Sequence, residues 1–164
     1  MIITRKEIIL RATFTTLTLL LTAFIWLHSL ASADESGQES ASVLVFLNML
    51  LERLQLNINL TEYFVRKLAH FSEFTAFGAL LSATFIAYKG ELKKQIPNML
   101  FILLAVPVTD EALQYFSPGR GPQVSDVLLD FSGCISGLIF TALVFNVIKY
   151  KKKGLKRSGK FKGK

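Results

Sequence analysis

Six ionisable side chains lie near one common end of three long apolar segments in this 164-residue chain. An ionised group in hydrocarbon costs roughly 2.5–3.5 kcal/mol on insertion scales, so such groups persist where they pair, line a cavity or carry out chemistry. We therefore interpret the set as one built site. The candidate catalytic residues are His70, Glu73, Asp110, Glu111, Asp126 and Asp130.

The types and spacing of these residues suit acid–base chemistry and cation binding. Arg66, His70 and Glu73 are separated by four and three positions, so they share one face of a helix. His70 would act as general base or nucleophile, and Glu73 would orient it or share its proton. Asp110 and Glu111 offer oxygen ligands that suit Mg²⁺ or Ca²⁺. The sequence identifies no cofactor, but these oxygen ligands make a divalent cation the candidate.

Basic and amide side chains next to the acids predict a substrate-binding function. Pro and Gly residues within 117–125 predict a turn that holds Arg120 over the acidic layer. An arginine presents a planar donor fork that matches carboxylate or phosphate. The substrate-binding candidates are Arg66, Lys67, Gln114 and Arg120.

Long apolar segments position these residues. The chain is 51% hydrophobic with a mean hydropathy of +0.43, which is too apolar for an ordinary soluble domain of this size. About 20 apolar residues suffice to cross a membrane, and four segments reach that length: 12–31, 68–88, 96–116 and 127–148. The predicted fold class is an all-α membrane protein with four transmembrane helices. The single cysteine, Cys134, allows no intrachain disulfide and is expected to lie in the core.

Two segments require a choice between alternatives. Residues 12–31 follow basic residues and end at Ala-Ser-Ala, as a secretory signal does, but the apolar run of about 19 residues exceeds the usual core of roughly 7–15. We therefore expect a retained transmembrane helix. Residues 41–56 are short for a crossing, which favours an amphipathic helix in the outer interface. A fifth crossing would place the basic C-terminal tail outside.

The distribution of Lys and Arg predicts the orientation. Nine of them and no acid occur in residues 149–164, whereas the remainder of this +7 chain has a net charge of −2. Basic residues also flank the N-terminus and follow 68–88, while 34–40, expected to be a loop, has acids only. The positive-inside rule then puts both termini in the cytoplasm, with 149–164 a basic tail that contacts anionic lipid. Arg66 and Lys67 would lie at the outer edge, against the rule, which indicates a role there.

The same topology predicts that the charged groups converge. At 1.5 Å per residue they lie about 3–9 Å below the outer edge, so they form a layer open to one side and no transmembrane ion path. Asp130, Gly133 and Gly137 fall on one helical stripe, and the two glycines have the spacing of a close helix contact. We therefore expect His70 and Glu73 to lie within direct or one-water hydrogen-bond reach of at least one acid from the other two segments.

Three stretches carry a family resemblance. Residues 66–74 read RKLAHFSEF, similar to a pattern R-K-x-A-H-F-x-E-Y with Phe74 at the Tyr position, and residues 110–120 fit D-E-x-x-Q-x-F-x-P-G-R. The following D-x-x-x-D/N-x-x-G positions are Asp126, Asp130 and Gly133, and a Ser36-x-x-x-Ser40 pair is also shared. Over residues 24–137 the chain thus resembles the VanZ-like family of small bacterial membrane proteins.

This resemblance implies a multipass protein of the bacterial cytoplasmic (inner) membrane that acts at the cell envelope, with residues 1–148 as the family domain. The family takes its name from a member that lowers susceptibility to the glycopeptide teicoplanin. The expected partners are membrane lipids and a lipid-linked cell-wall precursor or glycopeptide, and no nucleic acid. Phe74 lacks the hydroxyl of the family's Tyr, so no proton role is expected there.

Three functions remain open at this point. The first is an enzyme that acts on a lipid-linked or phosphate-bearing envelope substrate. The second is a non-catalytic binder of a lipid head group or glycopeptide, which would use the same residues for recognition. The third is a structural scaffold whose charges only pair with one another. No hydrolase or transferase signature in the sequence decides whether the protein is an enzyme.

Overall fold

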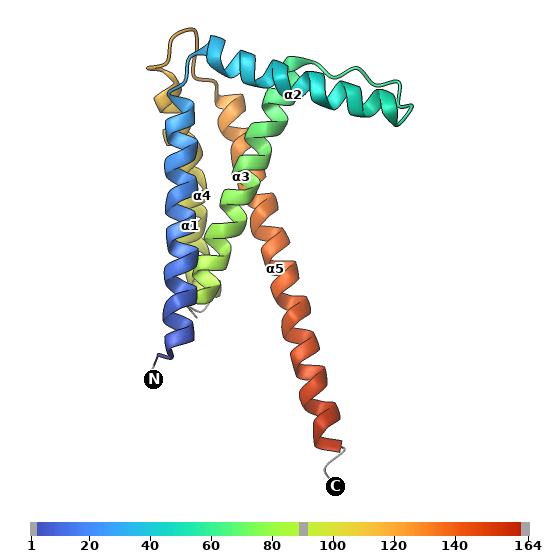
Figure 1. Cartoon of the computed structure of the whole chain (residues 1–164). Coiled ribbons are helices and arrows are strands. Elements are labelled where there is room, and N and C mark those ends of the chain that lie inside the picture. The colour runs from blue at the N-terminus through green and yellow to red at the C-terminus, as the bar shows by residue number, and fades with distance from the viewer. Residues whose placement is uncertain (1–2, 89–91, 162–164) are drawn as a thin grey trace.

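Five helices form the computed structural model, which describes residues 3–88 and 92–161. They are α1 (Arg5–Ser29), α2 (Ala33–Arg53), α3 (Glu62–Ala87), α4 (Leu92–Gln114) and α5 (Val124–Phe161). The described residues contain no strand, so the all-α prediction is confirmed. Helices α1, α3, α4 and α5 form the bundle, α2 lies across one end, and both termini lie at the other end (Figure 1).

The predicted basic segments are only partly covered by these residues. Lys89 and the last three residues of the tail at 149–164 lie outside the described residues. Up to Phe161 the tail continues α5 without a break, so the fourth predicted span and most of the tail belong to one helix.

The start of α2 corrects the prediction made from hydropathy. The Ser32 side chain accepts from the backbone N–H of Glu35, and Glu35 accepts from the Ser32 backbone N–H at 2.9 Å. This capping box satisfies the free donors of the first turn and lowers the pKa of the exposed Glu35. The helix therefore begins at Ala33, and residues 34–40 are helical instead of forming a loop. Hydropathy located only the apolar part of this helix and predicted its end at residue 56, whereas α2 ends at Arg53.

Helix α2 keeps an apolar face away from the rest of the protein. Val45, Phe46, Met49 and Leu50 are all exposed, and among the described helices the backbone of α2 comes close to that of α3 alone. Its position across the end of the bundle suits a helix in a membrane interface, as predicted, because the apolar face would be buried among acyl chains (Figure 1).

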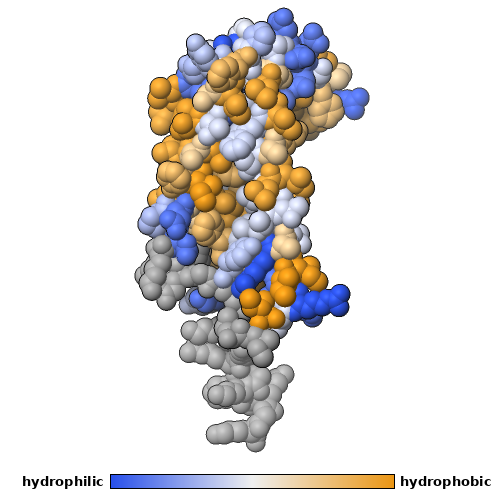
Figure 2. All heavy atoms as spheres, turned by 90° about the vertical axis from the view of Figure 1, so that its left-hand side faces the viewer, coloured by the Kyte–Doolittle hydropathy of each residue, from blue (hydrophilic) through white to orange (hydrophobic). Residues whose placement is uncertain are grey.

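Within the described residues, three helices, not four, are long and apolar enough to cross a membrane. These are Arg5–Ser29, Gln95–Gln114 and Val124–Lys151. The predicted count is wrong at 68–88, because α3 is long enough but carries charged and hydroxyl side chains along its length. It nevertheless runs the length of the bundle between the other helices (Figure 1). On the face of the molecule shown in Figure 2, a mostly apolar band separates the hydrophilic side chains at the two ends.

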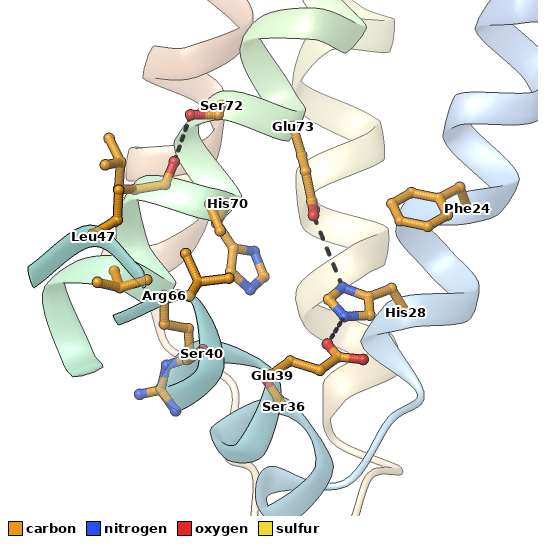
Figure 3. Close-up of a pocket in the computed structure, with 14 residues that line it drawn as sticks. Phe24, His28, Ser36, Glu39, Ser40, Leu47, Arg66, His70, Ser72 and Glu73 are labelled. Atoms are coloured by element: carbon orange, nitrogen blue, oxygen red, sulfur yellow. Dashed lines mark hydrogen bonds and ion pairs between the residues drawn. The ribbon is translucent and has the colours of Figure 1, made fainter. Parts of the chain in front are cut away.

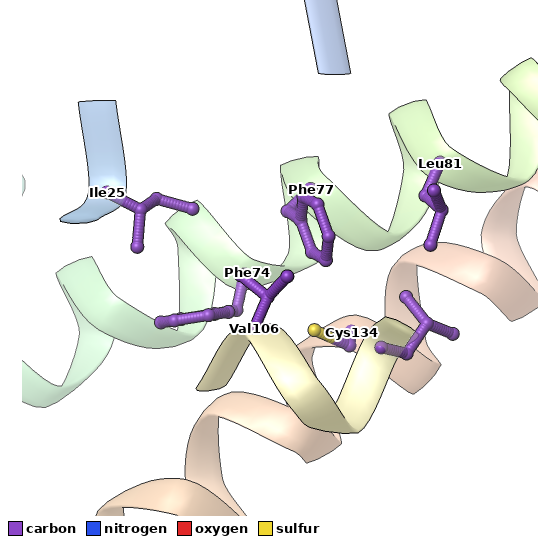
Figure 4. Packing of buried hydrophobic residues seen from close by; sticks show 7 residues of the cluster. Ile25, Phe74, Phe77, Leu81, Val106 and Cys134 are labelled. Carbon is purple, nitrogen blue, oxygen red and sulfur yellow. The ribbon is translucent and has the colours of Figure 1, made fainter. Parts of the chain in front are cut away.

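The core lies where α1, α3, α4 and α5 meet (Figure 4). Cys134 is fully buried there, which confirms its predicted place. Phe74 is also fully buried, so a tyrosine at this position would need a hydrogen-bond partner that the apolar cluster does not offer. The core residues are Ile25, Phe74, Phe77, Leu81, Leu103, Val106 and Cys134.

Glycines bring the backbones of α3 and α5 into contact. A Cβ atom added to Gly78 of α3 would lie 2.1 Å from the carbonyl oxygen of Cys134, and one added to Gly137 of α5 would lie 2.0 Å from that of Thr75. Gly133 is similarly close to α3. The predicted stripe of Gly133 and Gly137 is therefore the packing face of α5, and Gly78 completes it from the opposite helix.

Substitution of Gly137 by Ala should separate the two helices. The new methyl group would overlap backbone atoms, which cannot rotate away, so we expect a loss of roughly 1–3 kcal/mol of unfolding free energy. Thermal unfolding of the purified protein in detergent measures this loss. Gly121→Ala is the matched control, because a Cβ there meets nothing within 4 Å. Equal melting temperatures for the two variants would contradict the close contact.

Candidate functional site

Three of the predicted catalytic residues meet at the end of the bundle that α2 covers. One ligand atom each from His70 of α3, Asp110 of α4 and Asp130 of α5 lies within 4.8 Å of the other two. His70 Nδ1 is 3.9 Å from Asp130 Oδ2. The sequence predicts that His70 lies within direct or one-water reach of an acid from another segment, and this distance agrees with that prediction. Asp110 and Asp130 are 0% and 1% exposed, so neither carboxylate is exposed to solvent.

Asp110 is held from two sides. The Ser29 hydroxyl at the end of α1 donates to Oδ1, and Gln114 Nε2, one turn along α4, donates to Oδ2 at 3.1 Å. The Ser29 carbonyl in turn accepts from the Ser117 hydroxyl at 2.8 Å. These bonds fix the carboxylate and tie α1 to the turn that follows α4.

Asp130 has no comparable support. Both of its carboxylate oxygens are buried and have no hydrogen-bond partner among the described residues. The distance of 3.9 Å to His70 exceeds that of a hydrogen bond. A buried carboxylate without donors carries a large desolvation cost, so Asp130 is the least satisfied group of the site.

Lys67 and Asp126 form an ion pair next to this group. Lys67 Nζ contacts Asp126 Oδ2 and lies 5.3 Å from the centre of the Tyr63 ring. Arg66 Cζ lies 6.0 Å from the same ring. Asp126 therefore has a cationic partner of its own and stands apart from the two buried aspartates.

Arg66 and Arg120 line a small cavity without an acidic partner. No ion pair links either guanidinium to an acid within 3–88 and 92–161, and Arg120 Nη2 is buried without a hydrogen-bond partner. Burial and then the charge of Arg66 lower the pKa of Arg120, although a guanidinium remains protonated at neutral pH. The cavity measures about 140 Å³ and is also lined by Lys67, His70, Gln114 and Asp126, of which Asp126 is paired with Lys67.

Glu73 points to a histidine that the sequence analysis did not consider. Its Oε1 lies 4.0 Å from His28 Nδ1, and His28 Nε2 lies 2.7 Å from Glu39 Oε2 (Figure 3). The described residues show no direct hydrogen bond between Glu73 and an acid of α4 or α5, so for Glu73 the convergence through a water molecule stays a prediction. His28 was detectable as a polar residue near the C-terminal end of the segment 12–31.

A larger cavity of about 490 Å³ lies between α1, α2 and α3 (Figure 3). Apolar side chains supply much of its wall, among them Phe24, Leu47 and Leu68. Arg66 and His70 line this cavity as well as the small one. The two cavities therefore adjoin at these residues, one mainly apolar and the other polar with more basic than acidic side chains.

Glu111 does not join Asp110 as the sequence analysis expected. Its Oε1 accepts from the backbone N–H of Gln123 before α5, and its Oε2 is buried without a partner. Adjacent residues on an α-helix point about 100° apart, so the two carboxylates face different neighbours. Asp110 instead shares its site with residues of other helices.

Apolar helices around a charged site at one end define a helical integral membrane protein. The profile of the family described as VanZ/LLP1 matches residues 14–146. The chain therefore belongs to the VanZ/LLP1 family. No curated protein and no solved structure is significantly similar to it.

Removal of the Ser29 hydroxyl should destabilise the fold. Ser29→Ala deprives a fully buried Asp110 oxygen of its donor, at a cost of about 1–3 kcal/mol. Ser72→Ala is the control, because the Ser72 hydroxyl donates only to the Leu68 carbonyl oxygen of its own helix. Denaturant unfolding in detergent compares the two variants. A Ser29→Ala protein as stable as Ser72→Ala would show that the bond to Asp110 contributes nothing.

Proposed function

We propose that this protein binds the phosphate-bearing head group of a lipid-linked envelope molecule at the outer face of the bacterial cytoplasmic membrane. The observation that carries the proposal is the pair of guanidinium groups, Arg66 and Arg120, on one small cavity, where neither forms an ion pair with an acid of the described residues. The acid that lines this cavity, Asp126, is paired with Lys67. Two cations that repel each other are stabilised by an anion between them. Phosphate matches the planar donor fork of arginine.

The pattern of pairing favours ligand binding over a purely structural role. A scaffold would leave its charges paired with one another, as Lys67 and Asp126 are. Arg66 and Arg120, both partly buried, have no such partner within the described ranges, and the buried Nη2 atom of Arg120 has no hydrogen-bond partner there. A charge withdrawn from water is costly unless something compensates it. A bound anion supplies that compensation.

The larger cavity supports an amphiphilic ligand. A head group in the basic cavity would leave its hydrocarbon chain beside the apolar wall formed by Phe24, Val43, Leu47 and Leu68. Such a ligand would enter from the membrane, between α1 and α3. Polyisoprenyl phosphates, which carry cell-wall precursors, combine these two chemistries. We further propose that occupation of the site by such a precursor influences glycopeptide susceptibility.

Catalysis at His70 is the second candidate function. The observation that favours it is the position of the imidazole on both cavities, where the phosphate of a bound lipid would meet its chain. In an enzyme, His70→Ala would abolish turnover of the lipid phosphate and retain binding. In a binder, the same change would weaken affinity in a graded manner.

Removal of the Arg120 charge should weaken lipid binding. We expect Arg120→Gln to lower the affinity for a polyisoprenyl phosphate by about 10–150-fold, since a charged hydrogen bond contributes roughly 1.5–3 kcal/mol. Titration in detergent measures the affinity, with the uncharged polyisoprenol as second probe. Arg53→Gln, on the exposed end of α2, is the control and should bind as the unmodified protein does. Equal binding of phosphate and alcohol would exclude head-group recognition.

Cysteine labelling tests the orientation. In a Cys134→Ala background, Gln123→Cys should react with a membrane-impermeant maleimide in intact cells. Ser158→Cys in the basic tail should react only after the membrane is permeabilised. The expectation rests on the excess of Lys and Arg near both termini and on the position of the connection between α4 and α5, which contains residue 123, at the other end of the bundle (Figure 1). The reverse pattern would place the site in the cytoplasm.

A further inference from the structure

We infer that His70, Asp110 and Asp130 form a binding site for a divalent transition-metal ion, with Zn²⁺ as the best match. The three residues come from α3, α4 and α5, and their ligand atoms lie within 4.8 Å of one another. Ligands of a tetrahedral zinc ion at about 2.0–2.2 Å lie roughly 3.4 Å apart. The ligand atoms would therefore have to move together by up to about 1.4 Å, which rotation of the three side chains would have to supply.

The unsatisfied burial of the Asp130 carboxylate is the independent observation that points to a ligand. Its side chain is 1% exposed, and neither carboxylate oxygen has a hydrogen-bond partner among the described residues. One of these oxygens faces His70 Nδ1 at 3.9 Å, too far for a hydrogen bond and suitable for two atoms that share a metal. A bound cation would supply the charge and the bond that this carboxylate lacks.

Asp110 is already oriented as a metal ligand would be. Ser29 and Gln114 each donate to one of its oxygens, and each oxygen keeps a lone pair for a metal. Hydrogen-bonded carboxylates are the usual supporting arrangement around metal ligands. Ser29 and Gln114 are thus positioning residues in this site.

The donor set selects the metal. One imidazole nitrogen and two carboxylate oxygens suit Zn²⁺ better than Mg²⁺ or Ca²⁺, which prefer oxygen ligands alone. The charge of two carboxylates balances a divalent ion with a neutral histidine. Glu111, which the sequence paired with Asp110 for Mg²⁺ or Ca²⁺, is directed to Gln123 and takes no part.

Three protein ligands leave one tetrahedral position open, as in catalytic zinc sites. His70 and Gln114 line the small basic cavity, so the open position adjoins the place where Arg66 and Arg120 would hold an anion. A zinc ion there would present a water molecule or accept a phosphate oxygen. The metal site itself rests on the ligand geometry and does not require the head group.

Titration with zinc chloride alone tests the inference. Untagged protein, stripped with a chelator and held in detergent without lipid, should bind about one zinc ion per chain by calorimetry and elemental analysis. Asp130→Asn and His70→Ala should each lower the affinity at least about tenfold. Zinc should raise the melting temperature of the unmodified protein and not that of either variant. Glu111→Gln is the matched control, a buried neighbour of Asp110 that should bind zinc normally.

Each outcome decides the inference. Asp130→Asn removes an unpaired buried charge, so its melting temperature without zinc should equal or exceed that of the unmodified protein. If it fails to fold, His70→Ala carries the test alone. Zinc binding below a tenth of an equivalent, or equal affinity in Asp130→Asn, would overturn the metal site. Because no lipid is present, the result is separate from that of the head-group titration.

Discussion

The close contact of α3 with α5 is the constraint on which the rest of this structure depends. Glycines at positions 78, 133 and 137 let the two backbones touch, and no side chain could stand between them. Asp130 precedes Gly133 by three residues and so lies almost one turn from the contact. The same approach brings His70 of α3 within 3.9 Å of Asp130. A wider separation of the helices would leave the aspartate buried without the histidine.

The charges at this end are arranged in order of depth. Arg66, Lys67, Arg120 and the Lys67-paired Asp126 line the small cavity, as does His70, which also lies next to the buried Asp110 and Asp130. The excess of basic groups on the cavity favours an anion, and the buried acids favour a cation. The arrangement therefore suits a ligand in which a phosphate and a metal ion meet, and the adjoining apolar cavity suits its chain.

Helix α3 illustrates that average hydropathy does not show which side of a helix is covered by its neighbours. Its average composition falls short of that of a membrane span, while α1, α4 and α5 reach it. Yet α3 contacts every other helix, and its ionisable residues Lys67, His70 and Glu73 meet partners on other helices. A helix whose polar face is covered by its neighbours need not be apolar all round. Hydropathy counts residues and takes no account of the side on which they lie.

The sequence by itself determined the helical class, the end of the bundle at which the charges gather, the glycine stripe of α5 and the buried place of Cys134. These follow from composition, from the 3.6-residue period and from spacing within one segment, which are local properties. Only the tertiary structure decided which charges meet. Asp110 joins His70 and Asp130, whereas its neighbour Glu111 turns to Gln123 and Glu73 turns to His28. Partners on different helices depend on the rotation of each helix about its axis, and packing across the core sets that rotation.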